Sequence, residues 1–208
     1  MALTTMKGEA FWAYIFAPDT KFNPDGDFKL KFRAKGDAAV KLQEKVDTLL
    51  KESLEKAKEA NKGKKIKQAD APYHEVYNDN DEPTGELEFT FKQKAVIPTK
   101  NGPMKKRVMV VDAKGNLITE HLKVGNGSVV KVAYDPNLYF TPTAGAGVSL
   151  RLTGVQIIEL KEYEGGNSLG FGEEEGYEHK DNNNGSNDAT DEDEDEFFET
   201  ESKDEEDF

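Results

Sequence analysis

Positively charged side chains that alternate along two stretches are the residues of this sequence best suited to bind a ligand. Lys29, Lys31 and Arg33 recur at every second position, so a β-strand would present all three on one face. Such a face attracts phosphates, whose counterions are released on binding. Lys92 and Lys94 repeat the spacing further along the chain. We interpret the five residues as contacts for a nucleic-acid backbone; a solvated sheet face would show the same pattern.

Aromatic side chains alternate over residues 11–16. If Phe11 and Ile15 face the core together with Ala13, the even-numbered aromatics stay exposed. Exposed rings stack on unpaired bases of any sequence. This face would supply three base-stacking residues: Trp12, Tyr14 and Phe16. The opposite assignment, in which these rings form the core, remains open.

Two further aromatic residues, Tyr139 and Phe140, fall in a stretch expected to be a loop, residues 135–147. Binding residues concentrate in loops, although these rings could equally cap one end of a barrel.

A basic run follows the predicted helix and consists of Lys62, Lys64, Lys65 and Lys67. These lysines would either contact phosphates or form a solvated linker.

The elements that would position these residues are mostly strands. Alternation and turn residues predict strands at 11–16, 28–33, 86–95, 107–112, 128–134 and 148–160. Helical spacing predicts one helix, capped by Asp37 and ending near Ala60. Its expected apolar stripe is Val40, Val46, Leu49, Leu50, Leu54 and Ala57. Residues 98–103 are expected to form a turn. Short strands with one inserted helix indicate a β-sandwich or barrel and exclude alternating βαβ units.

Charge divides the 208 residues into two parts. Residues 166–208 contain 2 Lys+Arg and 18 Asp+Glu, a net charge of -16, whereas residues 1–165 have a net charge of +3. We expect residues 1–165 to form one domain and residues 166–208 a disordered acidic tail. Because the tail and a nucleic acid are both polyanions, they would compete for the same lysines. Three tail aromatics are predicted to anchor a partner protein: Phe197, Phe198 and Phe208.

The sequence offers little that suggests catalysis. It has no cysteine, which excludes disulfides, thiolate metal ligands and cysteine nucleophiles. The histidines His74, His121 and His179 match no metal or triad spacing. Residues 145–147 lack the third glycine of a dinucleotide fingerprint. We therefore predict no enzymatic activity, cofactor or metal, and the lack of a signal peptide or long apolar run predicts no membrane association.

Several motifs together resemble the single-stranded DNA-binding proteins of T7-like bacteriophages. They are residues 127–134, 139–150, 155–160, 110–115, Ala13-Tyr14-Ile15 with Pro18-Asp19, and the closing Asp204-Glu205-Glu206-Asp207-Phe208. The resemblance covers roughly residues 10–165 and the tail. It departs from the family in the linker after the helix and at Phe16, where the family need not have an aromatic.

The resemblance implies an OB-fold, an antiparallel β-barrel with the helix inserted. It also implies non-sequence-specific binding of single strands in phage replication, recombination and repair, annealing of complementary strands, and a tail that contacts phage or host replication proteins. By position, Trp12, Tyr14 and Tyr139 match aromatics of the family. The implied location is the cytoplasm of an infected bacterium. A homodimer stays open.

Three other functions fit parts of the pattern. An OB-fold RNA-binding protein of the cold-shock type would need the same face and would differ in recognition of the 2′-hydroxyl. An acidic-tailed chaperone would bind basic proteins through residues 166–208. A nuclease would need clustered carboxylates in the body, and the sequence singles out none.

Overall fold

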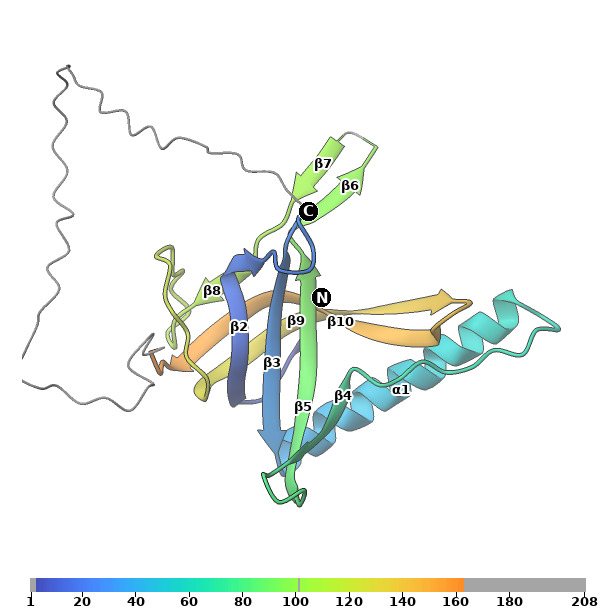
Figure 1. The fold of residues 1–208 in the computed structure, drawn as a ribbon, viewed down its shortest axis with the longest axis horizontal. Helices are drawn as coiled ribbons and strands as arrows, with labels where there is room; N and C mark the ends of the chain where they lie inside the picture. Colours follow the sequence, from blue (N-terminus) through green and yellow to red (C-terminus); the bar gives the residue numbers. More distant parts are fainter. Residues whose placement is uncertain (1–2, 101, 163–208) are drawn as a thin grey trace, which may run out of the picture. The chain divides into compact units, whose positions relative to one another are not determined.

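The computed structural model describes residues 3–100 and 102–162. Five strands close into a barrel: β2 (Gly8–Asp19), β3 (Asp27–Lys35), β5 (Pro83–Lys94), β10 (Gly145–Glu159) and β9 (Ser128–Thr141). They neighbour one another in that order, and β9 returns to pair with β2 (Figure 1). Neighbouring strands are antiparallel except β10, which runs parallel to β5. When the five barrel strands alone are numbered along the chain, their order around the ring is 1-2-3-5-4, as in an OB-fold, and the predicted fold class is confirmed.

The single helix of the described residues, α1 (Asp37–Ala60), is inserted between β3 and β5, as predicted. It buries one stripe at helical spacing, formed by Ala39, Leu42, Val46, Leu50, Ser53 and Ala57. The predicted stripe was wrong at Val40, whose side chain is 50% exposed. Asp37 is the first helical residue and not the cap, because Gly36 precedes the helix with a positive φ that favours glycine.

Of the five shorter strands in the described residues, three extend the barrel sheet and two form a separate hairpin. β1 (Leu3–Thr4) pairs with β9, β4 (Tyr73–Tyr77) pairs with β5, and β8 (Met109–Val111) pairs in parallel with β10. β6 (Val96–Thr99) and β7 (Gly102–Lys105) form a separate two-stranded hairpin that projects away from the barrel (Figure 1). The sequence prediction of a simple turn at residues 98–103 missed this hairpin.

The predicted loop at residues 135–147 is also wrong. β9 continues to Thr141 and β10 begins at Gly145, so the two strands form one long hairpin. Pro136 suggested a loop because it cannot donate a backbone hydrogen bond. Within the described pairings, this part of β9 has β10 on one side and no strand on the other, so the missing donor breaks no ladder.

The interior of the barrel is filled by side chains. Its largest fully buried members include Phe32, Phe89, Phe91 and Tyr134. The Phe91 ring meets Phe32 and Tyr134 edge-on, with centroid distances of 6.1 and 5.2 Å. A ligand must therefore bind to the outside of the strands. No helix in the described part of the chain is long and apolar enough to cross a membrane.

Phe91→Ala should lower the free energy of unfolding by about 3–5 kcal/mol, because it removes a fully buried ring that contacts two strands. Denaturant unfolding followed by circular dichroism would measure the loss. Phe22→Ala is the matched control, since that ring is 86% exposed and should change stability little. Equal losses for both variants would contradict the described core.

Candidate nucleic-acid interface

The outer face of β2, β3 and β5 brings together most of the predicted contact residues. Lys29, Lys31 and Arg33 lie on one face of β3, as alternation requires. Lys29 is directly opposite Lys92 of β5, and Lys94 follows on the same face. Trp12 and Tyr14 are exposed on β2 beside them. Seven of the ten predicted residues therefore share this face or its edge.

Trp12 projects because β2 contains a β-bulge. Phe11 is opposite Lys31 while Tyr14 is opposite Lys29, so β2 has one more residue than β3 over this interval. Trp12 absorbs the extra residue with φ 50°, and its side chain is 60% exposed. The side chain of Asn126 accepts a hydrogen bond from the Trp12 backbone N–H at 2.9 Å. A turn far away in sequence thus holds the indole outward.

The bulge corrects the predicted alternation of this strand. Phe11 is not part of the core: the guanidinium of Arg33 lies 4.0 Å from the centroid of its ring. Phe16 is partly buried against the core, and its ring lies 5.6 Å from that of His121. Of the three predicted aromatics, only Trp12 and Tyr14 are exposed.

Tyr14 and Lys29 form a cation–π pair on this face. The Lys29 ammonium lies 4.8 Å from the Tyr14 ring centroid and also pairs with Asp19. The hydrogen bond from Lys29, together with a backbone hydrogen bond from Lys21, holds the pKa of Asp19 below its ordinary value. The ring is thus fixed beside a cation, at the position where a base could stack and its phosphate could bind.

Glu88 is a buried carboxylate within the positive face. It is only 2% exposed, and it accepts hydrogen bonds from Lys31 at 2.5 Å and Arg33 at 2.7 Å. The imidazole of His74 lies 3.5 Å away. Burial alone would raise the pKa of Glu88, but the hydrogen bonds and charges of Lys31 and Arg33 outweigh burial and lower it. Glu88 therefore stays ionised and forms ion pairs with both Lys31 and Arg33.

Carboxylates compensate other cations as well. Asp27 pairs with Lys92 at 3.1 Å, whereas Lys94 has no ion pair within residues 3–100 and 102–162. These acids were not among the predicted contact residues. Glu88 alternates in register with Lys92 and Lys94, and that spacing was the available signal.

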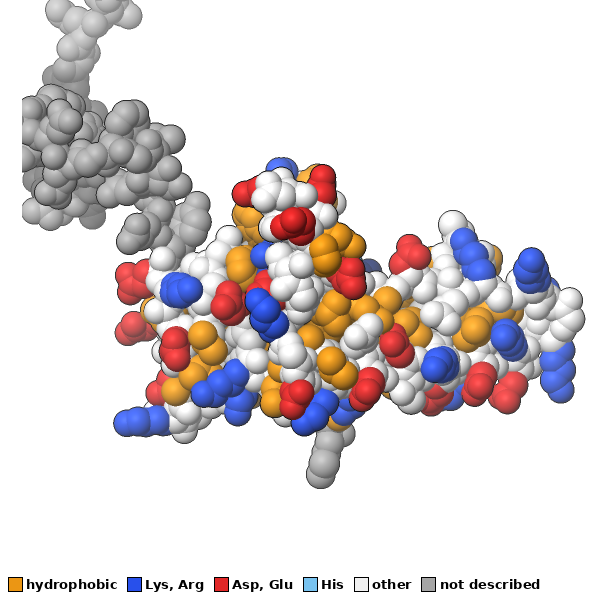
Figure 2. Space-filling model, turned by 90° about the horizontal axis from the view of Figure 1, so that it is seen from below, with side chains coloured by type: hydrophobic (Ala, Val, Ile, Leu, Met, Phe, Trp, Pro, Cys, Tyr) orange, Lys and Arg blue, Asp and Glu red, His pale blue; other side chains and the backbone are white. Residues whose placement is uncertain are grey.

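Tyr139 and Phe140 lie elsewhere, on the long β9–β10 hairpin. The Tyr139 ring lies across Gly147 on the opposite strand, where a β-carbon would come within 2.5 Å of the hydroxyl oxygen. Phe140 lines a groove of about 540 Å³ together with Lys64, Lys65 and Lys67. Figure 2 shows Lys and Arg side chains at this end of the described domain.

The basic linker is tied to this hairpin at its last lysine, Lys67. The backbone N–H of Ala146 donates to Lys67 at 2.9 Å, and that of Ala69 donates to Ala146 at 2.8 Å. Ser53 of α1 also lies within hydrogen-bond distance of the Gly147 carbonyl oxygen, at 2.9 Å. These contacts make a second basic and aromatic surface, separate from the face of β2, β3 and β5.

The predicted partner-binding residues and possible metal ligands remain to be located. The proposed partner contacts Phe197, Phe198 and Phe208 lie outside the described residues. Within the described residues, no group of three or more His, Asp or Glu side chains could hold a metal ion.

Comparison with known proteins relates the chain to a family. Residues 8–160 match the family model described as single-stranded DNA-binding protein, bacteriophage T7. The chain is 39% identical over 85 residues to a single-stranded DNA-binding protein of Enterobacteria phage T3, a match that spans 39% of this chain and 37% of that relative.

Solved structures show the same fold. The crystal structure of gp2.5, a single-stranded DNA-binding protein encoded by bacteriophage T7, is similar with a TM-score of 0.67 and 27% identity, over 86% of this chain and 99% of that one. The single-stranded DNA-binding protein of bacteriophage Enc34, in complex with single-stranded DNA, has a TM-score of 0.54 at 13% identity, over 79% of this chain and 89% of that one. The second likeness concerns the fold alone.

Acid should weaken the cluster around Glu88. Its pKa is lowered in the folded protein, so its contribution to stability is present above the ordinary carboxyl range, about pH 4.3, and is lost as the pH falls through the lower folded value. Between about pH 7 and pH 3, Glu88→Gln should lose less unfolding free energy than the unsubstituted protein. Glu86→Gln, which alters the more exposed pair with Lys35, is the control. An identical pH dependence for Glu88→Gln and the unsubstituted chain would contradict this role.

Proposed function

This chain belongs to the family of single-stranded DNA-binding proteins represented by that of bacteriophage T7, and we propose that it binds single-stranded DNA without sequence preference through the outer face of β2, β3 and β5. The observation that supports the face most directly is the Trp12 bulge. A large aromatic ring is held in solvent on a strand otherwise packed against the core, next to the Tyr14–Lys29 pair. An exposed ring in this position is available to stack on an unpaired base.

The aromatic and the basic side chains of this face would bind different parts of the strand. Trp12 and Tyr14 stack bases, which requires unpaired bases and so favours single strands over a duplex. Lys29, Lys92 and Lys94 bind phosphates. The side chains of Lys29 and Lys92 are 35% and 58% exposed, so a phosphate can reach each cation while it still holds its aspartate.

Lys31 and Arg33 share one partner, the buried carboxylate of Glu88. Removing both cations from Glu88 would leave an uncompensated buried charge, which is strongly unfavourable. These two residues therefore contact phosphate only while they also hold Glu88. Lys94, which has no ion pair among the described residues, makes the largest contribution of the five cations to the salt dependence of binding.

The wider role follows from the family. We propose that the protein acts in phage DNA replication, recombination and repair, and anneals complementary strands, in the cytoplasm of the infected bacterium. Residues 166–208 would contact phage or host replication proteins, with Phe197, Phe198 and Phe208 as anchors. The support is the phage origin of the relatives and the net charge of -16 in that segment.

Trp12 gives a direct test, because it is the only tryptophan of the chain. Intrinsic fluorescence should be quenched when oligothymidylate binds, and Trp12→Ala should weaken binding by about 1–3 kcal/mol through loss of one stacked base. Fluorescence anisotropy of a labelled oligonucleotide measures the affinity of the variant, which has no intrinsic tryptophan signal.

The control is Phe22→Ala, which removes an exposed ring from the loop between β2 and β3. An RNA oligonucleotide of matching sequence distinguishes the RNA-binding alternative, since only RNA offers the 2′-hydroxyl. Unchanged fluorescence on saturation, with wild-type affinity for a folded Trp12→Ala variant, would place the binding face elsewhere.

Removal of residues 166–208 should tighten DNA binding at low salt, because the acidic segment and DNA are polyanions competing for the same lysines. The gain should shrink as salt screens the charges. Titrations of both forms over a salt series measure it. Equal affinities at low salt would rule out competition and leave the DNA-binding face untouched.

A further inference from the structure

A positively charged hairpin is the largest feature that the proposed face does not use. Residues 95–111 contain four cations and no carboxylate. The four are Lys100, Lys105, Lys106 and Arg107. All are exposed, and within residues 3–100 and 102–162 none forms an ion pair. The cations of β3 are compensated by acids, whereas those of the β6–β7 hairpin are not.

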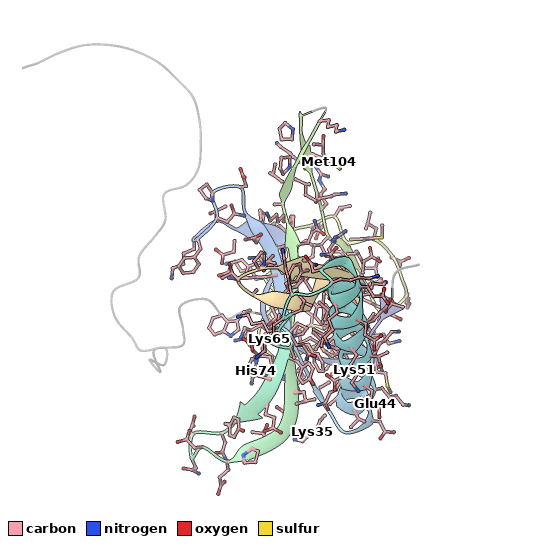
Figure 3. All side chains as sticks on the ribbon, turned by 90° about the vertical axis from the view of Figure 1, so that its right-hand side faces the viewer. Lys35, Glu44, Lys51, Lys65, His74 and Met104 are labelled. Atoms are coloured by element: carbon pink, nitrogen blue, oxygen red, sulfur yellow. The ribbon has the colours of Figure 1, made fainter. Side chains whose placement is uncertain are left out.

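The root of this hairpin is fixed to the barrel. The Lys106 backbone N–H donates to the Ala95 carbonyl at 2.7 Å, and the Ala95 N–H donates to Gly26 at 3.0 Å. Ala95 and Val108 are both buried on either side of the hairpin. Met104 lies on the part that projects away from the barrel and is 46% exposed (Figure 3). The cations at the root are therefore held in a defined place.

A groove of about 720 Å³ lies at this root. Ile15 and Phe16 of β2 contribute to its apolar lining, and Asp25 is the one acid that lines it among the described residues. Three consecutive cations line it as well: Lys105, Lys106 and Arg107. Aromatic and apolar surface next to cations suits an unpaired base and its phosphate.

We propose that this groove and the β6–β7 hairpin form a second contact for single-stranded DNA, which holds the strand after it leaves Trp12 and Tyr14. The inference rests on the proposed function. Continuity supports it: Phe16 follows Tyr14 on the same strand by two residues, a rise of about 7 Å, so the groove begins where the β2 face ends. The contact lengthens the bound segment and supplies phosphate-binding charge that the compensated β3 face lacks.

The test compares two oligothymidylates, of about 5 and about 20 nucleotides, which bracket the span of one OB-fold. Lys105→Gln, Lys106→Gln and Arg107→Gln are combined in the full chain. With the long oligonucleotide, the slope of log affinity against log salt should fall by about 2, since each single-strand phosphate contact contributes roughly 0.7. With the short one, bound on the β2 face, the slope should stay unchanged.

The matched control removes three exposed cations of α1 by combining Lys41→Gln, Lys45→Gln and Lys51→Gln. It loses the same charge and should leave both slopes unchanged. Circular dichroism and the unfolding midpoint establish that both variants fold.

Each other outcome overturns the inference. If the salt slope of the hairpin variant is unchanged with the long oligonucleotide, the hairpin does not contact DNA. The proposed function still holds in that case if the unsubstituted chain binds both oligonucleotides. An equal fall with both oligonucleotides, or in the α1 control, means a general charge effect. Tighter binding by the hairpin variant at low salt means that the hairpin binds the acidic segment. If the unsubstituted chain binds neither oligonucleotide, the proposed function and the inference both fail.

Discussion

Closure of the barrel by β10 is the constraint on which the rest of the structure depends. β10 pairs with β9 on one side and with β5 on the other, where Leu150 is in register with Phe91. A five-stranded ring of this size leaves space inside only for its own side chains. Any ligand must then be bound by the outward-facing residues, the bulges and the hairpins, which are the features in which this chain places its aromatics and cations.

Strand register imposes a second condition on those outward residues. The same alternation that aligns Lys29, Lys31 and Arg33 also brings Glu88 and Asp27 onto their face. A face built this way can stay folded without a ligand, because its cations other than Lys94 are already paired with carboxylates. The consequence is a face whose cations are mostly compensated by carboxylates, in contrast to the uncompensated β6–β7 hairpin.

The sequence predicted what depends on short-range periodicity and missed what depends on register. The helix from Asp37 to Ala60 and the strands around β3 and β5 were predicted from spacing alone. The Trp12 bulge was not, because a positive φ outside glycine leaves no mark in composition. Asn126 could not be linked to Trp12 because the two meet only after β9 closes on β2. Pro136 misled the prediction because its effect depends on whether the strand has a second neighbour.

The pairing of β2 with β9 also affects how the chain folds during synthesis. β3 follows β2 directly, but Gly8 pairs with Val130, far along the chain. At a synthesis rate of about 5–20 residues per second, the first barrel strand emerges from the ribosome on the order of ten seconds before its second partner. During that interval one edge of β2 lies open to strands of other nascent chains. Each nascent chain is therefore open to mispairing during this interval. A chaperone that covers β2, or wide spacing of ribosomes on the message, would prevent it.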